Sequence, residues 1–373
     1  MLRILAIYPG LNPLFDEVVY ALLPLVESGN AVRVLTTRGS GLKSSEEAGD
    51  YENFHGVEIC RVFHAAGQDL FHGGPADAEA LKLADEFRPE FLFVNSTNCL
   101  RLANLIRQKH DVPVLLRLES SDPLTLIPRR KYLGVPWLGR EVVGRKLWSS
   151  LSGRTDAIMV NDPNDVPLLA SLSRRGPPVY YAGHCAQQPA GLELPAERDR
   201  DEMIYIGSLI RHKNCQLWLK TIPAILEHTP VKRFTIIGRG PFEHIVKELI
   251  ARYGDRIQHL PGVTRMEALR RLGSAYFAYT ASTTGWGFLC DAWSTSTPVL
   301  CPQSRFNIVP SWSGMMPQTQ KALISTVRRL YEDPEYYATM QEGGRLRYES
   351  EHTASVVAKQ YAQIIRETVA ARA

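Results

Sequence analysis

The chain has 373 residues, of which 45% are hydrophobic and 22% are charged, and these ordinary values exclude a wholly disordered protein. At roughly 150 residues per domain, this length favours two or three domains. The 43 Lys and Arg residues nearly balance the 39 Asp and Glu residues, and the formal charge of +4 is too small to indicate nucleic-acid binding.

Short apolar runs alternate with helical patterns in the first half of the chain. Strands are expected at 3–8, 31–35, 91–94, 113–118 and 157–160, and helices at 16–28, 77–87 and 99–110. This alternation is typical of β-α-β units and predicts a parallel sheet. It defines a first domain at residues 1–187.

The alternation stops at 188–202, a charged, Pro-bearing segment without a period, which predicts a linker. It then resumes, with strands expected at 203–206, 234–237, 257–260, 276–280 and 298–301, and helices at 215–228, 242–253, 318–332, 334–348 and 354–371. We therefore expect a second domain at 203–352 and a terminal helix at 353–373. The predicted class is α/β, with two Rossmann-like, doubly wound parallel-sheet domains facing across a cleft, since ligands bind at the carboxyl ends of such strands.

Three motifs in the second half carry candidate chemistry. After the strand at 203–206 come Gly207, Arg211 and Lys213, at the start of a helix. Backbone N–H groups at such a start attract anions, and the two cations suit a diphosphate. A solvated basic loop explains the same residues equally well, so both interpretations stay open.

The second motif, at 238–241, places Gly238 and Gly240 between a strand and a helix. It lacks the third glycine of a dinucleotide fingerprint, so a tight strand-to-helix turn is favoured. The third motif runs from 283 to 299. Its glycines, Gly285 and Gly287, allow a backbone to approach a ligand. Asp291 follows, either to accept hydrogen bonds from sugar hydroxyls or, as the residues alone slightly favour, as a charge in the first turn of a helix.

In order and spacing, these motifs resemble those of the retaining glycosyltransferases of family four, which have the GT-B fold. Such enzymes carry V-G-R-L-x-x-x-K-G, V-G-x-G-P, a G-x-V turn and E-G-F-G-x-x-x-x-E-A-x-A-x-G-T-P-V. The counterparts here lie at 207–213, 238–241, 262–263 and 283–299. The resemblance extends over nearly the whole chain, is strongest from 204 to 298, and implies C-terminal helices that pack back toward the first domain.

The resemblance assigns a donor site to the second domain. It implies that Lys213 contacts the donor diphosphate and that Asp291 holds the donor ribose. Ser208 stands where the family has Arg, and Arg211 is expected to supply the missing charge. The first glutamate of the family's pair falls on Thr283, or on Thr284 if the loop is one residue shorter. The full set of donor-binding candidates is Gly10, Asn12, Gly207, Ser208, Arg211, Lys213, Gly240, Val263, Thr283, Thr284, Gly285, Trp286, Gly287 and Asp291.

In the first domain the resemblance places Gly10 and Asn12 in a loop that approaches the donor phosphates and the acceptor. A histidine of the family falls on Glu119, which is the candidate general base on an acceptor hydroxyl, with Asp122 as the second candidate. An ordinary turn and a helix-capping carboxylate remain the alternatives for these positions.

The charge is unevenly distributed: residues 1–100 hold 7 basic and 14 acidic side chains (net −7), 101–187 hold 13 and 7 (net +6), and 188–373 hold 23 and 18 (net +5). The basic segment 128–151 also carries Trp137 and Trp148. Such segments lie on anionic membranes in some proteins. Packing of its apolar face into the first domain is the favoured interpretation.

The compartment is indicated by the cysteines and the apolar runs. The six cysteines form no C-x-x-C pair and none has zinc-ligand spacing, so free thiols in a reducing compartment are expected. No run approaches the ~18 apolar residues of a membrane span. We expect a cytoplasmic protein, with peripheral contact with the inner face of the membrane through 128–151 as the further alternative.

The sequence therefore predicts a glycosyltransferase that moves a sugar from a nucleotide-diphosphate donor to the hydroxyl of a sugar, natural-product or lipid-linked acceptor. Retention is implied by the resemblance, and neither metal nor cofactor is expected. The only Asp-x-Asp, Asp199 to Asp201, lies in the expected linker. Two alternatives stay open, a sugar-nucleotide epimerase on the same scaffold and a catalytically impaired nucleotide-binding protein.

Overall fold

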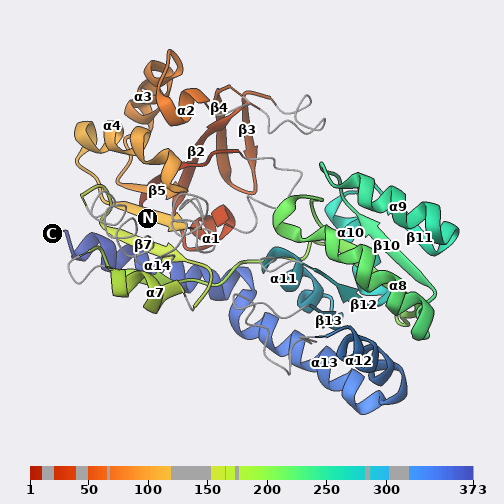
Figure 1. Cartoon of the computed structure of the whole chain (residues 1–373). Coiled ribbons are helices and arrows are strands. Elements are labelled where there is room, and N and C mark those ends of the chain that lie inside the picture. Colours follow the sequence, from red (N-terminus) through yellow and green to blue (C-terminus); the bar gives the residue numbers. More distant parts are fainter. Residues whose placement is uncertain are drawn as a thin grey trace. The chain divides into compact units, whose positions relative to one another are not determined.

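The computed structural model describes residues 1–10, 21–38, 49–64, 68–118, 153–163, 165–172, 176–281, 286–301 and 319–372. The chain divides into two compact units. Unit 1 comprises Met1–His184 and Ala354–Ala373, and unit 2 comprises Cys185–Thr353. Figure 1 shows both units as sheets carrying helices, which is the predicted α/β class.

Unit 1 is built on an eight-stranded sheet of order β3-β4-β2-β1-β5-β6-β7-β8. Every neighbouring pair is parallel except β3 and β4. The strands are β1 (Arg3–Ile7), β2 (Ala31–Thr37), β3 (Tyr51–Phe54), β4 (Val57–Phe63), β5 (Phe91–Asn95), β6 (Val114–Leu118), β7 (Ala157–Val160) and β8 (Val179–Tyr181). The helices are α1 (Leu23–Glu27), α2 (Gln68–His72), α3 (Ala76–Phe87), α4 (Leu100–His110), α7 (Asp165–Leu172) and α14 (Ala354–Ala370).

The central strands of unit 1 are continuous apolar runs because both faces of a parallel sheet are covered. All five residues of β5 are buried, and Phe93 stacks on Tyr361 of α14 with ring centroids 5.9 Å apart. Gln360 of α14 also accepts a hydrogen bond from the backbone N–H of Gly183 at 2.8 Å. The C-terminal helix α14 is thereby part of unit 1 (Figure 1).

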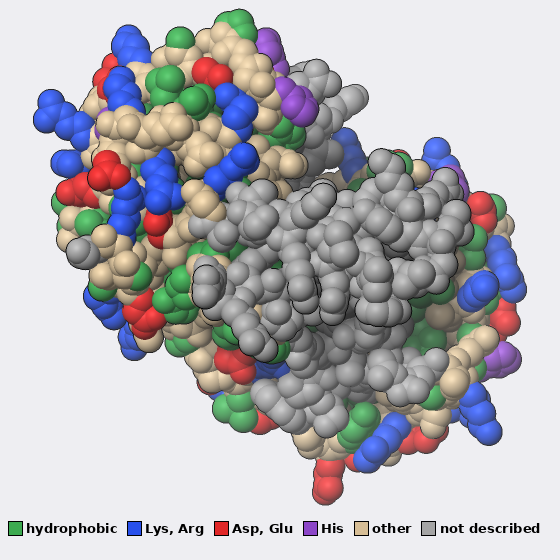
Figure 2. All heavy atoms as spheres, turned by 60° about the vertical axis from the view of Figure 1, so that its left-hand side comes forward, with side chains coloured by type: hydrophobic (Ala, Val, Ile, Leu, Met, Phe, Trp, Pro, Cys, Tyr) green, Lys and Arg blue, Asp and Glu red, His purple; other side chains and the backbone are tan. Residues whose placement is uncertain are grey.

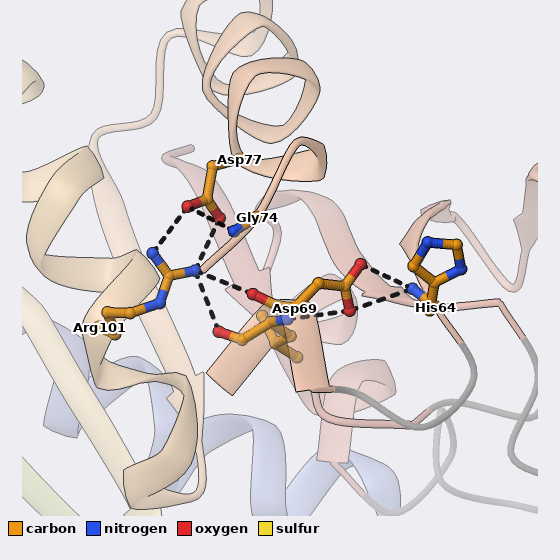
Figure 3. Close-up of polar contacts among 6 residues, drawn as sticks. His64, Asp69, Gly74, Asp77 and Arg101 are labelled. Atoms are coloured by element: carbon orange, nitrogen blue, oxygen red, sulfur yellow. Dashed lines mark hydrogen bonds and ion pairs between the residues drawn. The ribbon is translucent and has the colours of Figure 1, made fainter. Parts of the chain in front are cut away.

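A polar junction joins three helices of unit 1 (Figure 3). Arg101 of α4 donates to both carboxylate oxygens of Asp77 on α3, at 2.8 and 2.6 Å, and to the backbone carbonyl of Asp69 on α2 at 3.2 Å. The Asp69 carboxylate accepts from the backbone N–H of His64 at 2.9 Å. Both terminal guanidinium nitrogens of Arg101 and the carboxylates of Asp69 and Asp77 have partners within the unit, so we interpret the junction as structural.

Unit 2 is built on a five-stranded, all-parallel sheet of order β11-β10-β9-β12-β13. The strands are β9 (Asp199–Ile206), β10 (Arg233–Ile237), β11 (Ile257–Leu260), β12 (Ala275–Tyr279) and β13 (Val299–Leu300). The helices are α8 (Trp218–His228), α9 (Glu243–Tyr253), α10 (Arg265–Ser274), α11 (Trp286–Ser294), α12 (Gln320–Glu332) and α13 (Pro334–Arg347). Its core gathers apolar residues from the strands and from α8, α9, α12 and α13.

The structure corrects one expectation about the junction between the domains. Strand β9 begins at Asp199, so the last four residues of the expected linker belong to the sheet. Asp199 pairs with Arg233, and Asp201 accepts from Lys232 at 2.9 Å. These carboxylates lie at the amino end of β9, and ion pairs with β10 and the residue before it hold them there.

Three further features concern the surface charges, the cysteines and the length of the helices. Basic and acidic side chains are interspersed on the coloured part of the face drawn in Figure 2, and half-buried pairs such as Arg271 with Glu267 occur in the described chain. All six cysteines are buried. Within the described residues, the structure contains no helix of sufficient length and apolar character to span a bilayer.

Candidate functional site at the carboxyl end of the second sheet

The strand order of unit 2 reverses at β9, which pairs with β10 on one side and with β12 on the other. In open α/β sheets, ligands bind outside the carboxyl ends of the strands at such a reversal. Gly207 directly follows β9, and α11 begins seven residues after β12 ends. The first motif and the described part of the third motif therefore both follow strands at this edge.

The loops after β9 and β10 are joined backbone to backbone. Leu209 donates to the carbonyl of Arg239 at 2.8 Å, and Phe242 donates to the carbonyl of Leu209 at 3.0 Å. A Cβ atom on Gly238 would lie 1.9 Å from the carbonyl oxygen of Gly207, and one on Gly240 would lie 2.4 Å from that of Leu209. Both glycines have φ near +150°. The G-x-G motif therefore permits two loops to pack closely, which holds the loop after β9 in place.

The two candidate cations lie on a 3-10 turn, Arg211–Lys213, just beyond this loop. Arg211 is exposed and Lys213 is half-buried. Asn214 ends the turn in the left-handed conformation, with φ of 51°. Its side-chain amide donates to the carbonyl of Ala281, two residues beyond β12, at 3.3 Å. This bond ties the cationic turn to the neighbouring strand end.

The residues behind this turn are packed and unreactive. Burial raises the pKa of the Cys215 thiol to about 11, while the nearby charge of Lys213 acts in the opposite direction. The Tyr205 hydroxyl donates to the carbonyl of Ser208 at 3.2 Å, and its ring contacts Trp218 with centroids 4.8 Å apart. Ser208 itself is exposed, so the position of the family's Arg faces solvent without a charge.

Asp291 lies in the second turn of α11, since the helix begins at Trp286. Its interpretation as a first-turn charge is therefore wrong. Its carboxylate accepts from Arg265, the first residue of α10, at 2.9 Å from Nη2 to Oδ1 and at 3.4 Å from Nη1 to Oδ2. The two side chains are only 13% and 14% exposed. An acidic side chain at the predicted position is thus held by a partner on the preceding helix.

Sequence reasoning missed Arg265. It directly follows the G-x-V turn and Thr264, whose side chain caps α10 by accepting from the backbone N–H of Glu267. Arg265 also donates to the carbonyl of Gln187, at 2.9 Å from Nη2 and 3.3 Å from Nε. The position of Arg265 just after this turn could have singled it out in the sequence. Its pairing with Asp291, 26 residues away, could not be predicted from the sequence.

The Trp286 ring packs against two other aromatic rings and a guanidinium group. Its ring centroid lies 6.3 Å from that of Trp293 and 5.9 Å from that of His352. The guanidinium of Arg347 on α13 lies 4.9 Å from the Trp293 ring and 5.7 Å from the Trp286 ring. The buried side chains of Trp293, Arg347 and His352 thus pack against Trp286 at the start of α11, where Trp286 and Gly287 are half-buried.

The remaining candidates are placed as follows. Gly207, Ser208, Arg211, Lys213, Gly240, Val263, Trp286, Gly287 and Asp291 all lie in unit 2 at or beyond the carboxyl ends of its strands. Gly10 lies three residues beyond β1, at the reversal of strand order in unit 1. Asn12, Glu119, Asp122, Thr283, Thr284, Gly285 and the segment 128–151 lie outside the described residues.

No protein-family model and no curated sequence matches the chain, whereas several solved structures are similar to it. Sucrose-phosphate synthase (tll1590) from Thermosynechococcus elongatus aligns with a TM-score of 0.75 at 19% identity over 99% of both chains. Anabaena Alr3699/HepE in complex with UDP-glucose aligns with a TM-score of 0.70 at 13% identity, over 98% of this chain and 100% of the other. The catalytic domain of starch synthase IV from Arabidopsis thaliana, bound to ADP and acarbose, aligns with a TM-score of 0.68 at 12% identity over 99% of both.

These likenesses, together with two parallel-sheet units that each reverse strand order, define the class of fold. The chain has the GT-B fold, as the motifs predicted.

Proposed function

We propose that the chain is a glycosyltransferase that transfers a sugar from a nucleotide-diphosphate donor to an acceptor hydroxyl. The observation that carries this proposal is the convergence, at the reversal in unit 2, of the cationic turn Arg211–Lys213 with the helix that bears Asp291. A donor of this kind needs cations for its diphosphate and hydrogen-bond acceptors for its ribose. Similar folds were solved with UDP-glucose and with ADP.

In this proposal, the charge of the cationic turn lowers the barrier to transfer. Negative charge develops on the diphosphate as its bond to the sugar breaks, and fixed cations stabilise that charge without reorganising. Lys213 and Arg211 supply the positive charge. They lie on a turn that is held by the hydrogen bond from Asn214 to Ala281. We propose that they take the place of a metal ion, and that transfer proceeds with retention as the family resemblance implies.

The acceptor is assigned to residues of unit 1. Glu119, with Asp122 as second candidate, is proposed to accept the proton of the attacking hydroxyl. The acceptor classes remain a sugar, a natural product or a lipid-linked saccharide, in a cytoplasmic protein. Support comes from the sequence, in which Glu119 follows Leu118, the last residue of β6.

The test is incubation of the purified protein with a panel that includes UDP-glucose and ADP-glucose. Chromatography measures the released nucleoside diphosphate and the recovered donor. Slow release with one donor, increased by the right acceptor, is the expected result. Recovery of an epimerised donor would show an isomerase instead of a transferase. Thermal stabilisation by a nucleotide without any turnover would replace it by a binding protein.

A further inference from the structure

We propose that Arg265 is a positioning residue that presents the Asp291 carboxylate to the vicinal hydroxyls of a ribose, and so makes the site selective for ribonucleotides. This inference rests on the proposed function, because it takes a nucleoside diphosphate as the ligand. It assigns a specific role to a residue that the family motifs leave unassigned.

The geometry of Arg265 is that of a fixed fork. Two guanidinium nitrogens donate to the two oxygens of Asp291, at 2.9 and 3.4 Å. The same group also donates to the backbone carbonyl of Gln187 at 2.9 Å. The capped start of α10 fixes the backbone of Arg265, and both side chains are nearly buried. Two-point pairing of this kind restricts the carboxylate to one orientation.

This orientation matters for hydroxyl recognition. A carboxylate has about four lone-pair positions, so Asp291 can accept from the guanidinium and from further donors at the same time. The guanidinium also cancels the carboxylate charge, which would otherwise repel a nearby diphosphate. Removing Arg265 would take away the guanidinium that restricts this nearly buried carboxylate to one orientation, so the carboxylate could turn away from a ribose.

A purely structural bridge between α10 and α11 would have a different signature. Its loss would lower the melting temperature and weaken every nucleotide by the same factor. A positioning role affects the ribose contact specifically. The ratio of affinities for a ribonucleotide and its 2′-deoxy analogue therefore separates the two.

The experiment measures dissociation constants of UDP, 2′-deoxy-UDP, ADP and 2′-deoxy-ADP by calorimetry for the full-length protein. We expect the wild type to prefer one ribonucleotide to its deoxy analogue by about tenfold, the value of one lost hydrogen bond to a charged group. In Arg265→Met the preference should fall below about threefold. In Arg265→Lys, which keeps the charge but not the fork, it should be intermediate.

Arg271→Met is the matched control, because Arg271 lies on the same helix and pairs only with Glu267 among the described ion pairs. It should keep the wild-type preference. An undiminished preference in Arg265→Met, or in Arg265→Lys if the first variant does not fold, would overturn the inference and leave the proposed function intact. Wild-type protein that binds each ribonucleotide and its 2′-deoxy analogue equally would also overturn the inference and leave the proposed function intact. Failure of the wild type to bind any of the four nucleotides would overturn the inference and the proposed function together.

Discussion

Two cationic side chains, Arg211 and Lys213, stand just beyond the carboxyl end of β9. Lys213 is half-buried beside Cys215, and its charge counteracts the effect of burial on the pKa of that thiol. Arg211 is exposed. The half-buried charge interacts more strongly with a bound anion because less water screens it. Lys213 is therefore the better single target for a test of the diphosphate assignment.

Lys213→Ala is expected to raise the dissociation constant of the bound nucleoside diphosphate by at least about tenfold. A hydrogen bond to a charged group contributes roughly 1.5–3 kcal/mol, and about 1.4 kcal/mol corresponds to a factor of ten. Calorimetric titration measures this change. Lys220→Ala, on an exposed position of α8, should bind as the wild type does. Unchanged affinity in Lys213→Ala would refute the assignment.

Asp165 of unit 1 predicts a pH dependence of stability. It is 5% exposed, and burial, assisted by the charge of Asp162, raises its pKa from 3.8 to about 6. The fold thus favours the protonated form. This contribution to stability is fully present below about pH 4 and is lost as the pH rises through about 6. At about 1.4 kcal/mol per pH unit, the loss is at most about 3 kcal/mol.

Asp165→Asn removes the titrating group, so its melting temperature relative to the wild type should increase between pH 4 and pH 7.5. The comparison is made by calorimetry at several pH values, in which the titration of all other groups is common to both proteins. A difference that stays constant across this range would show that Asp165 does not titrate as described.

At the scale of elements, the two glycine-bearing loops are the feature that shapes the site. The sequence motif at 238–241 favoured a tight turn, and a tight turn alone does not explain both glycines. The explanation is the neighbouring loop, because carbonyl oxygens of Gly207 and Leu209 occupy the space where side chains would be. Such a contact depends on β9 and β10 being neighbours, which local sequence does not encode.

Gly238→Ala should therefore destabilise unit 2 strongly. The added Cβ would overlap the carbonyl oxygen of Gly207 at 1.9 Å, and the backbone there has φ of +148°. Overpacking and a left-handed conformation each cost about 1–3 kcal/mol, so about 3 kcal/mol or more is expected in denaturant unfolding. Gly262→Ala is the control, since no atom lies within 4 Å of its added Cβ. Equal stability of the two variants would contradict the proposed backbone contact.

The β3–β4 hairpin is an element that sequence reasoning missed. His55 and Gly56 connect the strands with φ of 52° and 80°, the two positive values of a type I′ turn. Gly fits this conformation easily, but His at the first position gave only a weak signal. Helix α10, which begins at Arg265, was likewise missed.

At the scale of the whole molecule, the chain passes from unit 1 to unit 2 after His184 and returns at Ala354. The uneven charge along the sequence acquires a partial explanation. The second half, with a net charge of +5, contains the cationic turn proposed for the diphosphate. The basic segment 128–151 lies outside the described residues, and packing of its apolar face into the first domain is the interpretation that the sequence favours.

Sedimentation with lipid vesicles tests that interpretation in the intact protein. If the apolar face of the segment packs within unit 1, the protein should sediment no more with vesicles containing 30% phosphatidylserine than with neutral vesicles. Strong, salt-sensitive sedimentation would instead support peripheral membrane contact. Replacement of Arg129, Arg130 and Lys131 by Gln would then abolish it.

The sequence by itself determined the α/β class, the two-domain organisation around a mostly parallel pair of sheets, and the positions of the glycines, cations and Asp291 that define the candidate site. These features depend on local periodicity and on short motifs, which are readable along the chain. Only the tertiary structure decided that Asp291 pairs with Arg265 and that Gly238 faces the carbonyl oxygen of Gly207. Such contacts join residues far apart in sequence, because parallel strands bring their carboxyl ends to one edge and the helices that follow them into contact.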